Sequence, residues 1–245
     1  MFSHDALDNS FFTDYFVLNK PRDVVSGDFW WAKDKNINGK SYTYLAVADC
    51  TGHGVPGAMM SMLGGALLNE LTAGDKLPQP NEVLGEMRER IKFNLNQDKN
   101  KKNNRADSME MGLCLFDRSN NKLYYSGAGR PLYSIKANSN EPKKIEIYKG
   151  NRQPVGIYVK EKPFNVTEID YKEGDAFFMF SDGITDQFNE DGTEKYGQRR
   201  LKQFLVEEEP NEEFSTIKNK VSSTLKSWSG KMEQIDDQIL VGIKI

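Results

Sequence analysis

Acidic side chains stand at four places where an apolar stretch of the sequence begins or ends. Asp28 follows "VVSG", Asp49 ends "YTYLAVA", Asp182 follows "AFFMFS", and Asp236 and Asp237 directly precede "QILVGIKI". A single acid at a strand end usually forms a turn or a cap. Four such places in one chain favour a second interpretation, in which the strand ends meet and the carboxylates lie together.

Carboxylates that lie together unpaired repel one another, and the repulsion raises the pKa of some of them. Few basic residues lie near them in sequence, Lys20 and Arg22 among them, so divalent cations are the obvious counter-charge. Oxygen-rich, histidine-poor sites suit Mg²⁺ or Mn²⁺, whereas Zn²⁺ prefers Cys and His ligands. Two ions ~3.5–4 Å apart lower the pKa of a shared water and neutralise a phosphate, which permits hydrolysis of a phosphomonoester without a protein nucleophile.

Other hydrolytic or nucleotide-binding schemes fit the sequence poorly. Neither Cys50 nor Cys114 begins the Cys-x5-Arg pattern of a cysteine phosphatase, and the G-x-S-x-G elbow of a serine hydrolase is absent. The loop from Gly52 to Gly57 resembles the start of a P-loop, but Ala58 and Met59 stand where Lys and Ser/Thr should follow.

Composition narrows the class of protein further. The 245 residues suit one domain, or one domain with a short extension, and the net charge of −3 argues against a nucleic-acid partner. The most basic stretch, Asp98 to Asp107, is interpreted as a solvated loop. Two cysteines indicate a reducing compartment. We expect a cytoplasmic protein without membrane insertion, or the cytoplasmic output domain of a membrane-bound sensor, because the chain has neither a secretion signal nor a run of ~20 apolar residues.

Hydrophobic periodicity predicts strands in blocks and helices in blocks. The predicted strands are Tyr15–Asn19, Val24–Trp31, Ser41–Ala48, Met109–Phe116, Lys122–Ser126, Leu132–Ile135, Ile145–Tyr148, Phe164–Ile169, Ala176–Phe180 and Ile239–Ile245. The predicted helices are Ala58–Leu71, a second one capped by Asn81, Gln198–Val206 and Glu213–Trp228. This arrangement indicates an α+β domain with antiparallel sheet buried by helices. In the first helix, the methionine-rich stripe is expected to pack in the core, and Gly64 to let the helix pack against the sheet.

With these residues in view, the sequence resembles the metal-dependent Ser/Thr protein phosphatases of type 2C, in particular the bacterial branch named after the stage II sporulation protein E. The resembling motifs are "VSGDFWW", "ADCTGHGVPGAMMSM", "SGAGRPLY", "PVGI", "FSDGITDQF" and "IDDQILVGI", in family order over about residues 15 to 245. The resemblance implies a β-sandwich of two antiparallel sheets flanked by helix pairs (α-β-β-α layers). We therefore expect residues 1–14 to be an extension or the remnant of a linker and residues 15–245 to be the phosphatase domain.

The resemblance also implies the ligands of two Mn²⁺ or Mg²⁺ ions, or of three. Asp28, Asp49 and Asp182 correspond to metal-binding and catalytic carboxylates, with Asp49 bridging both ions. Cys50 would offer only its backbone carbonyl. Of the last pair, Asp236 corresponds to the ligand, and Asp237 fits the neighbouring polar position.

The sequence departs from the family pattern at several positions. His53 lies four residues beyond Asp49, whereas eukaryotic relatives place their acid histidine two beyond, so His53 either acts as general acid or shapes the loop. Glu110 stands where branch members often carry Asp. Asp186 is expected to cap the helix after "SDG" rather than to bind metal, and Arg22 either binds phosphate or is a plain surface residue.

These observations predict a phosphatase that hydrolyses phosphoserine or phosphothreonine through a metal-activated water. The implied substrate is a phosphorylated bacterial regulator of the anti-anti-sigma type, the implied partner is an upstream sensor domain, and a homodimer is left open. The alternative is a catalytically silent module that keeps the fold for regulated binding. A two-metal nuclease or cyclase is disfavoured by the acidic chain.

Overall fold

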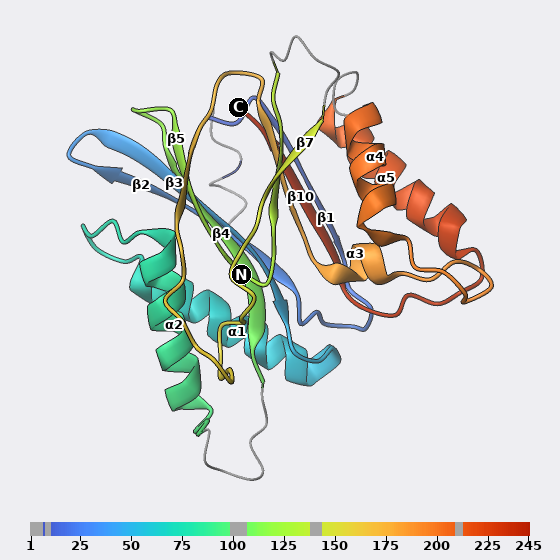
Figure 1. Ribbon diagram of the computed structural model, residues 1–245, viewed down its shortest axis with the longest axis horizontal. Helices are drawn as coiled ribbons and strands as arrows, with labels where there is room; N and C mark the ends of the chain where they lie inside the picture. Colours follow the sequence, from blue (N-terminus) through green and yellow to red (C-terminus); the bar gives the residue numbers. More distant parts are fainter. Residues whose placement is uncertain (1–6, 8–10, 99–106, 138–143, 209–212) are drawn as a thin grey trace.

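The computed structural model describes residue 7 and residues 11–98, 107–137, 144–208 and 213–245. Its strands form two antiparallel five-stranded sheets (Figure 1). One sheet has the order β2 (Phe29–Ile37), β3 (Lys40–Cys50), β4 (Met109–Asp117), β5 (Lys122–Ala128) and β8 (Thr167–Asp170). The other has the order β1 (Asp14–Lys20), β10 (Gln238–Lys244), β9 (Ala176–Phe180), β6 (Leu132–Ile135) and β7 (Ile145–Tyr148).

Helices cover the outer face of each sheet, so the molecule has four layers (Figure 1). The helices are α1 (Gly54–Leu71), α2 (Pro80–Asn94), α3 (Asp182–Asp186), α4 (Gly197–Glu208) and α5 (Phe214–Ser229). The pair α1 and α2 packs on the β2–β8 sheet, and α4 and α5 pack on the β1–β7 sheet. The expected α+β sandwich of two antiparallel sheets flanked by helices is therefore confirmed.

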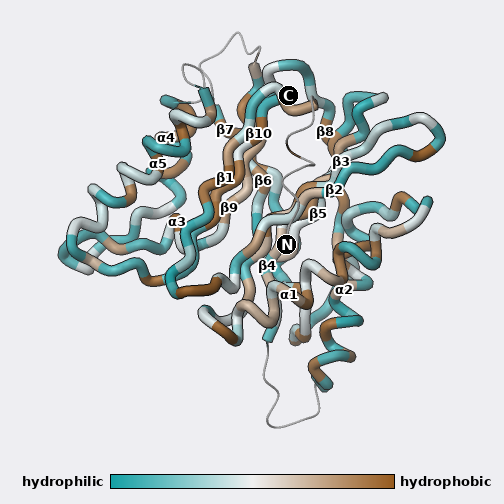
Figure 2. The backbone as a smooth tube through the Cα atoms, turned by 180° about the vertical axis from the view of Figure 1, so that it is seen from behind, coloured by the Kyte–Doolittle hydropathy of each residue, from teal (hydrophilic) through white to brown (hydrophobic). Residues whose placement is uncertain are grey.

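The central strands are apolar on both faces because each face meets another layer. In β3, Leu45 and Val47 pack between the two sheets, whereas Tyr44 and Ala46 pack on the side of α1 and α2. Successive side chains of a strand point to opposite faces, so a strand buried on both sides reads as a continuous apolar run. Figure 2 shows hydrophobic residues concentrated along β1, β9 and β10, whereas α4 and α5 carry mainly hydrophilic ones.

The buried face of α1 differs from the expected methionine stripe. Met59 and Met62 are 67% and 56% exposed, while Met60 and Leu68 are buried. Gly64 lies on the buried face, where an added Cβ would come within 2.8 Å of the Phe29 ring. The expected packing of the helix through this glycine is confirmed, but the stripe prediction was wrong for the two exposed methionines, because close approach at the glycine sets the rotation of the helix.

Three other local predictions need correction. The predicted strand Val24–Trp31 begins only at Phe29, so Asp28 lies in the connection before β2 and not inside a strand. The predicted strand Phe164–Ile169 begins at Thr167. The cap of α2 is Gln79, not Asn81, because Pro80 occupies the first helical position, where its missing N–H costs nothing.

The segment before β1 takes part in the core. Leu7 and Phe12 are buried between the two sheets, and the Phe12 ring meets the Phe116 ring edge-on at 5.5 Å between centroids. We therefore propose that the domain predicted for residues 15–245 extends upstream of residue 15 to include these side chains. Most of the predicted solvated loop Asp98–Asp107 lies outside the described residues.

Candidate metal centre

The acids at the four strand ends are brought to one end of the sandwich. Asp28 precedes β2 and Asp49 lies near the end of β3, and these two strands pair antiparallel with Phe29 opposite Ala48. Asp182 follows β9 and Asp236 precedes β10, which pair with Phe180 opposite Leu240. Figure 1 shows the β1–β2 connection, the start of α1 and α3 at this same end of the sandwich.

An arginine with a mostly covered side chain, which the sequence prediction missed, lies among these acids. One nitrogen of Arg130, Nη2, is 2.8 Å from Asp49 Oδ2, 2.8 Å from Glu110 Oε2 and 2.9 Å from Asp182 Oδ2. Glu110 is directly opposite Asp49 in the pairing of β3 with β4. The only sequence signal for Arg130 is a basic residue in the glycine-containing turn "SGAGRP" between two strands, and nothing in that signal indicates where the side chain points.

Asp28 is a buried acid with an unpartnered carboxylate oxygen. Its side chain belongs to a residue only 5% exposed, and its Oδ2 atom has no hydrogen-bond partner. Burial, and after it the charge of Asp49, raises the pKa of Asp28 to about 9. Burial also raises the pKa of Asp49 to about 7, although Arg130 opposes the shift. A buried carboxylate with an unpartnered oxygen is costly, so the single guanidinium of Arg130 does not balance all the acids of this cluster.

The two neighbouring acids before β10 have different surroundings. The carboxylate of Asp237 is buried and accepts hydrogen bonds from the backbone N–H groups of Arg22 and Gly27, at 2.7 Å each. It therefore anchors the β1–β2 connection. Asp236 is partly exposed, and burial, together with the charge of Asp182, raises its pKa. Asp236 thus has the freer carboxylate of the pair.

The remaining predicted site residues lie at the rim or in the frame of the cluster. His53 Nδ1 is 2.8 Å from Asp23 Oδ2, and both side chains are about half exposed. Arg22 is exposed. Cys50 is a buried free thiol at the end of β3, and burial raises its pKa well above the usual value. Asp186 is the last residue of α3, where it pairs with Lys195 at 2.7 Å, so its predicted capping role was wrong; the N-cap of α3 is Ser181.

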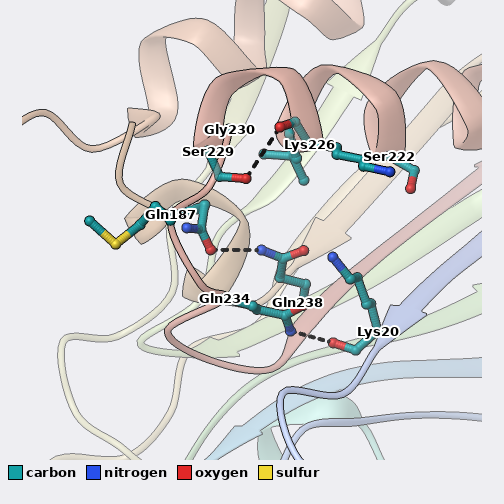
Figure 3. A pocket seen from close by; sticks show the side chains of 10 residues that line it. Lys20, Gln187, Ser222, Lys226, Ser229, Gly230, Gln234 and Gln238 are labelled. Atoms are coloured by element: carbon teal, nitrogen blue, oxygen red, sulfur yellow. Dashed lines mark hydrogen bonds between the residues drawn. The ribbon is translucent and has the colours of Figure 1, made fainter. Parts of the chain in front are cut away.

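A pocket of about 400 Å³ adjoins the loop that carries Asp236 and Asp237, on the side of α5. In Figure 3, Gln234 donates a hydrogen bond to the Lys20 carbonyl at 2.8 Å, and Gln238 donates to the Gln187 side chain at 3.3 Å. None of the predicted metal ligands lines this pocket. These contacts join the segment before β10 to the end of β1, and the start of β10 to the residue that follows α3, which helps to position the adjacent acids.

The donor set suits hard divalent cations. It consists of carboxylate oxygens, one of them unpartnered on Asp28, and such oxygens are the ligands that Mg²⁺ and Mn²⁺ prefer. Within the described residues, no three His, Cys, Asp or Glu side chains already form a closed metal-binding group. The carboxylates of Asp49, Glu110 and Asp182 converge instead on the guanidinium of Arg130. The residues therefore fit the metals in type and charge, with Arg130 lying among them.

The raised pKa values predict how stability depends on pH in the absence of metal. In the unfolded chain both carboxyls ionise near pH 4, whereas in the folded protein Asp49 keeps its proton to about 7 and Asp28 to about 9. Between these limits the folded state binds more protons, so stability falls as pH rises. We expect the Tm in EDTA to be lower at pH 8.5 than at pH 6, with saturating Mn²⁺ narrowing the difference. A Tm in EDTA that stays constant or rises over this interval would contradict the prediction.

Two antiparallel sheets between helix pairs, with acids gathered at one end, define the class of type 2C protein phosphatases. The sequence profile of the stage II sporulation protein E family matches residues 39–245, and the chain belongs to this family. No sequence among functionally curated proteins matched the chain.

Solved structures agree with this family. The SiaA-PP2C domain of Pseudomonas aeruginosa superposes with a TM-score of 0.79 at 27% identity, covering 94% of this chain and 85% of that one. The PP2C phosphatase domain of SpoIIE from Bacillus subtilis, with a fragment of its regulatory domain, superposes with a TM-score of 0.69 at 15% identity, covering 95% of this chain and 63% of that one. RsbX in complex with magnesium superposes with a TM-score of 0.60 at 14% identity, covering 94% of each chain.

None of the described helices is long and apolar enough to cross a bilayer.

Proposed function

We propose that this chain is a metal-dependent phosphoprotein phosphatase that hydrolyses phosphoserine or phosphothreonine on a bacterial regulatory protein. One observation carries the proposal: acids from four separate segments gather at one end of a type 2C sandwich. The Asp28 Oδ2 atom has no partner there, which indicates room for a further positive charge. Membership of the stage II sporulation protein E family and the similarity to the SiaA-PP2C domain support it.

In this proposal, Asp28, Asp49, Asp182 and Asp236 hold two Mn²⁺ or Mg²⁺ ions, together with the backbone carbonyl of Cys50. When bound, the ions supply an acidified water and neutralise the phosphate. Asp49 is the ligand best placed to serve both ions, because its charge raises the pKa of Asp28 and the charge of Asp182 raises its own pKa.

Other side chains would position the metal ligands or contact the substrate. Asp237 is assigned to positioning, since both of its oxygens accept backbone hydrogen bonds. His53 is our candidate for protonating the leaving serine or threonine oxygen, with Asp23 holding its ring at 2.8 Å. Arg22 is exposed on the connection that Asp237 anchors, from which it could contact the substrate phosphate.

The proposed substrate is a phosphorylated regulator of the anti-anti-sigma type, and the proposed controlling partner is a sensor or regulatory domain. Two comparisons support this class of partner: the SpoIIE structure includes a regulatory fragment, and a structure from Mycobacterium tuberculosis contains RsbU and RsbW domains in one protein. A homodimer and a cytoplasmic location belong to the same proposal.

Turnover of p-nitrophenyl phosphate and of a phosphoserine peptide tests the function. We expect turnover with Mn²⁺ and loss of turnover in EDTA. In Asp182→Asn the turnover rate should drop by at least about 100-fold, since losing even an outer partner of a metal ligand lowers activity by 10- to 100-fold. Asp186→Asn, four residues away on the same helix and paired with Lys195, is the matched control and should keep its activity. Wild-type turnover no higher than that of Asp182→Asn on both substrates would favour a silent binding module instead.

A further inference from the structure

The Arg130 side chain occupies the centre of the acidic cluster. It is 11% exposed, and a single nitrogen, Nη2, makes all three ion pairs, with Asp49, Glu110 and Asp182. Two of these partners are the proposed ligands Asp49 and Asp182, and the third, Glu110, is not. The guanidinium therefore neutralises the same oxygens that a bound metal ion would use.

The Arg130 side chain is held at one atom, and its base is fixed. Its Nε atom is buried without a hydrogen-bond partner, so not all the N–H donors of the guanidinium are used in this position. The backbone beneath it is firmly placed, because the Arg130 carbonyl accepts a hydrogen bond from the Tyr125 hydroxyl and the preceding Gly129 N–H donates to Asn151 at 2.8 Å. The long side chain can therefore change its partners without moving the turn.

We propose that Arg130 is a built-in counter-cation that competes with the metal for Asp49 and Asp182 and moves onto Glu110 when the metal binds. The inference rests on the proposed function of this site. The carboxylates repel one another when no cation lies between them, so Arg130 holds them together in the metal-free protein. The cost is a lower affinity for metal, since two cations that share the same oxygens repel each other.

Metal affinity of the EDTA-stripped protein, measured by calorimetric titration with Mn²⁺, tests this proposal directly. We expect Arg130→Gln to bind Mn²⁺ at least about tenfold more tightly than wild type and Arg130→Lys, which keeps a charge, to lie between them. Arg118→Gln is the matched control, because Arg118 pairs with Asp34 at 2.6 Å at the opposite end of β4, and it should bind as wild type does.

Equal or weaker binding by Arg130→Gln, with wild type binding normally, would overturn the inference and leave the proposed function standing. Absence of Mn²⁺ binding in wild type and in every variant would overturn both. Thermal melting gives a second measurement: Arg130→Gln should have a lower Tm than wild type in EDTA and a larger gain in Tm on adding Mn²⁺. An equal gain in the two proteins would contradict the competition.

If Arg130→Gln does not fold, wild type itself provides the test. The Arg130 guanidinium resonances, assigned by their absence in Arg130→Lys or by residue-specific labelling, are followed by NMR during titration with diamagnetic Mg²⁺. We expect the Nη2 resonance to shift as Asp49 and Asp182 are taken by the metal and Arg130 keeps only Glu110. Guanidinium signals that stay unchanged while the protein saturates with Mg²⁺ would overturn the proposal.

Discussion

Asp49→Asn is expected to remove phosphatase activity while making the metal-free protein more stable. The substitution takes away the carboxylate that we assign to both ions, so metal-dependent turnover should fall by more than the 10- to 100-fold that an outer partner of a ligand is worth. The same change removes one negative charge from a cluster in which burial raises the pKa of Asp49 to about 7. Arg130 keeps its ion pairs with Glu110 and Asp182.

Turnover with Mn²⁺ and melting in EDTA at pH 8 measure the two effects. We expect the Tm in EDTA to rise by a few degrees, which corresponds to about 1–2 kcal/mol in a chain of this size. Asp34→Asn is the control, because Asp34 lies toward the far end of the same sheet, paired with Arg118, and should leave activity intact. Activity that survives in Asp49→Asn would exclude Asp49 as a shared ligand, and a lower Tm would contradict the repulsion argument.

Gly57→Ala is expected to disrupt both folding and the site, although the residue lies within a helix, where alanine is normally preferred. An added Cβ would come within 2.3 Å of the Gly52 carbonyl oxygen and 2.8 Å of the Gly27 Cα, both of them backbone atoms. Gly27 donates its N–H to Asp237, so pushing it away breaks the anchor of the β1–β2 connection next to Asp28. Overpacking costs typically 1–3 kcal/mol, and more where backbone must move.

The measurement compares Gly57→Ala with Gly85→Ala, a glycine of α2 whose added Cβ would meet nothing within 4 Å. The control should gain about 0.5–1 kcal/mol from helix propensity, a small rise in Tm. For Gly57→Ala we expect a fall in Tm of about 5 °C or more, with weaker Mn²⁺ binding. Equal Tm changes in the two variants would show that Gly57 of α1 does not lie as close to the backbone of Gly27 and Gly52 as described.

Local pattern was enough to predict much of this protein. Strands such as Ala176–Phe180 and Leu132–Ile135 were predicted with their observed bounds, because their apolar runs are flanked by turn residues. The fold class followed from the order of strands and helices together with the family motifs. The acids at the strand ends were also visible, since antiparallel neighbours such as β2 and β3 necessarily bring their paired ends together.

The tertiary structure decided what depends on contacts between distant segments. Neither the position of Arg130 among three acids nor the binding of Asp237 to two backbone amides can be read from neighbouring residues. The rotation that exposes Met59 and buries Met60 depends on how closely α1 approaches the sheet. The Arg130 position, the Asp237 contacts and the rotation of α1 share one physical reason. Periodicity indicates which residues avoid water, whereas contact partners are set by the packing of segments that lie far apart in the chain.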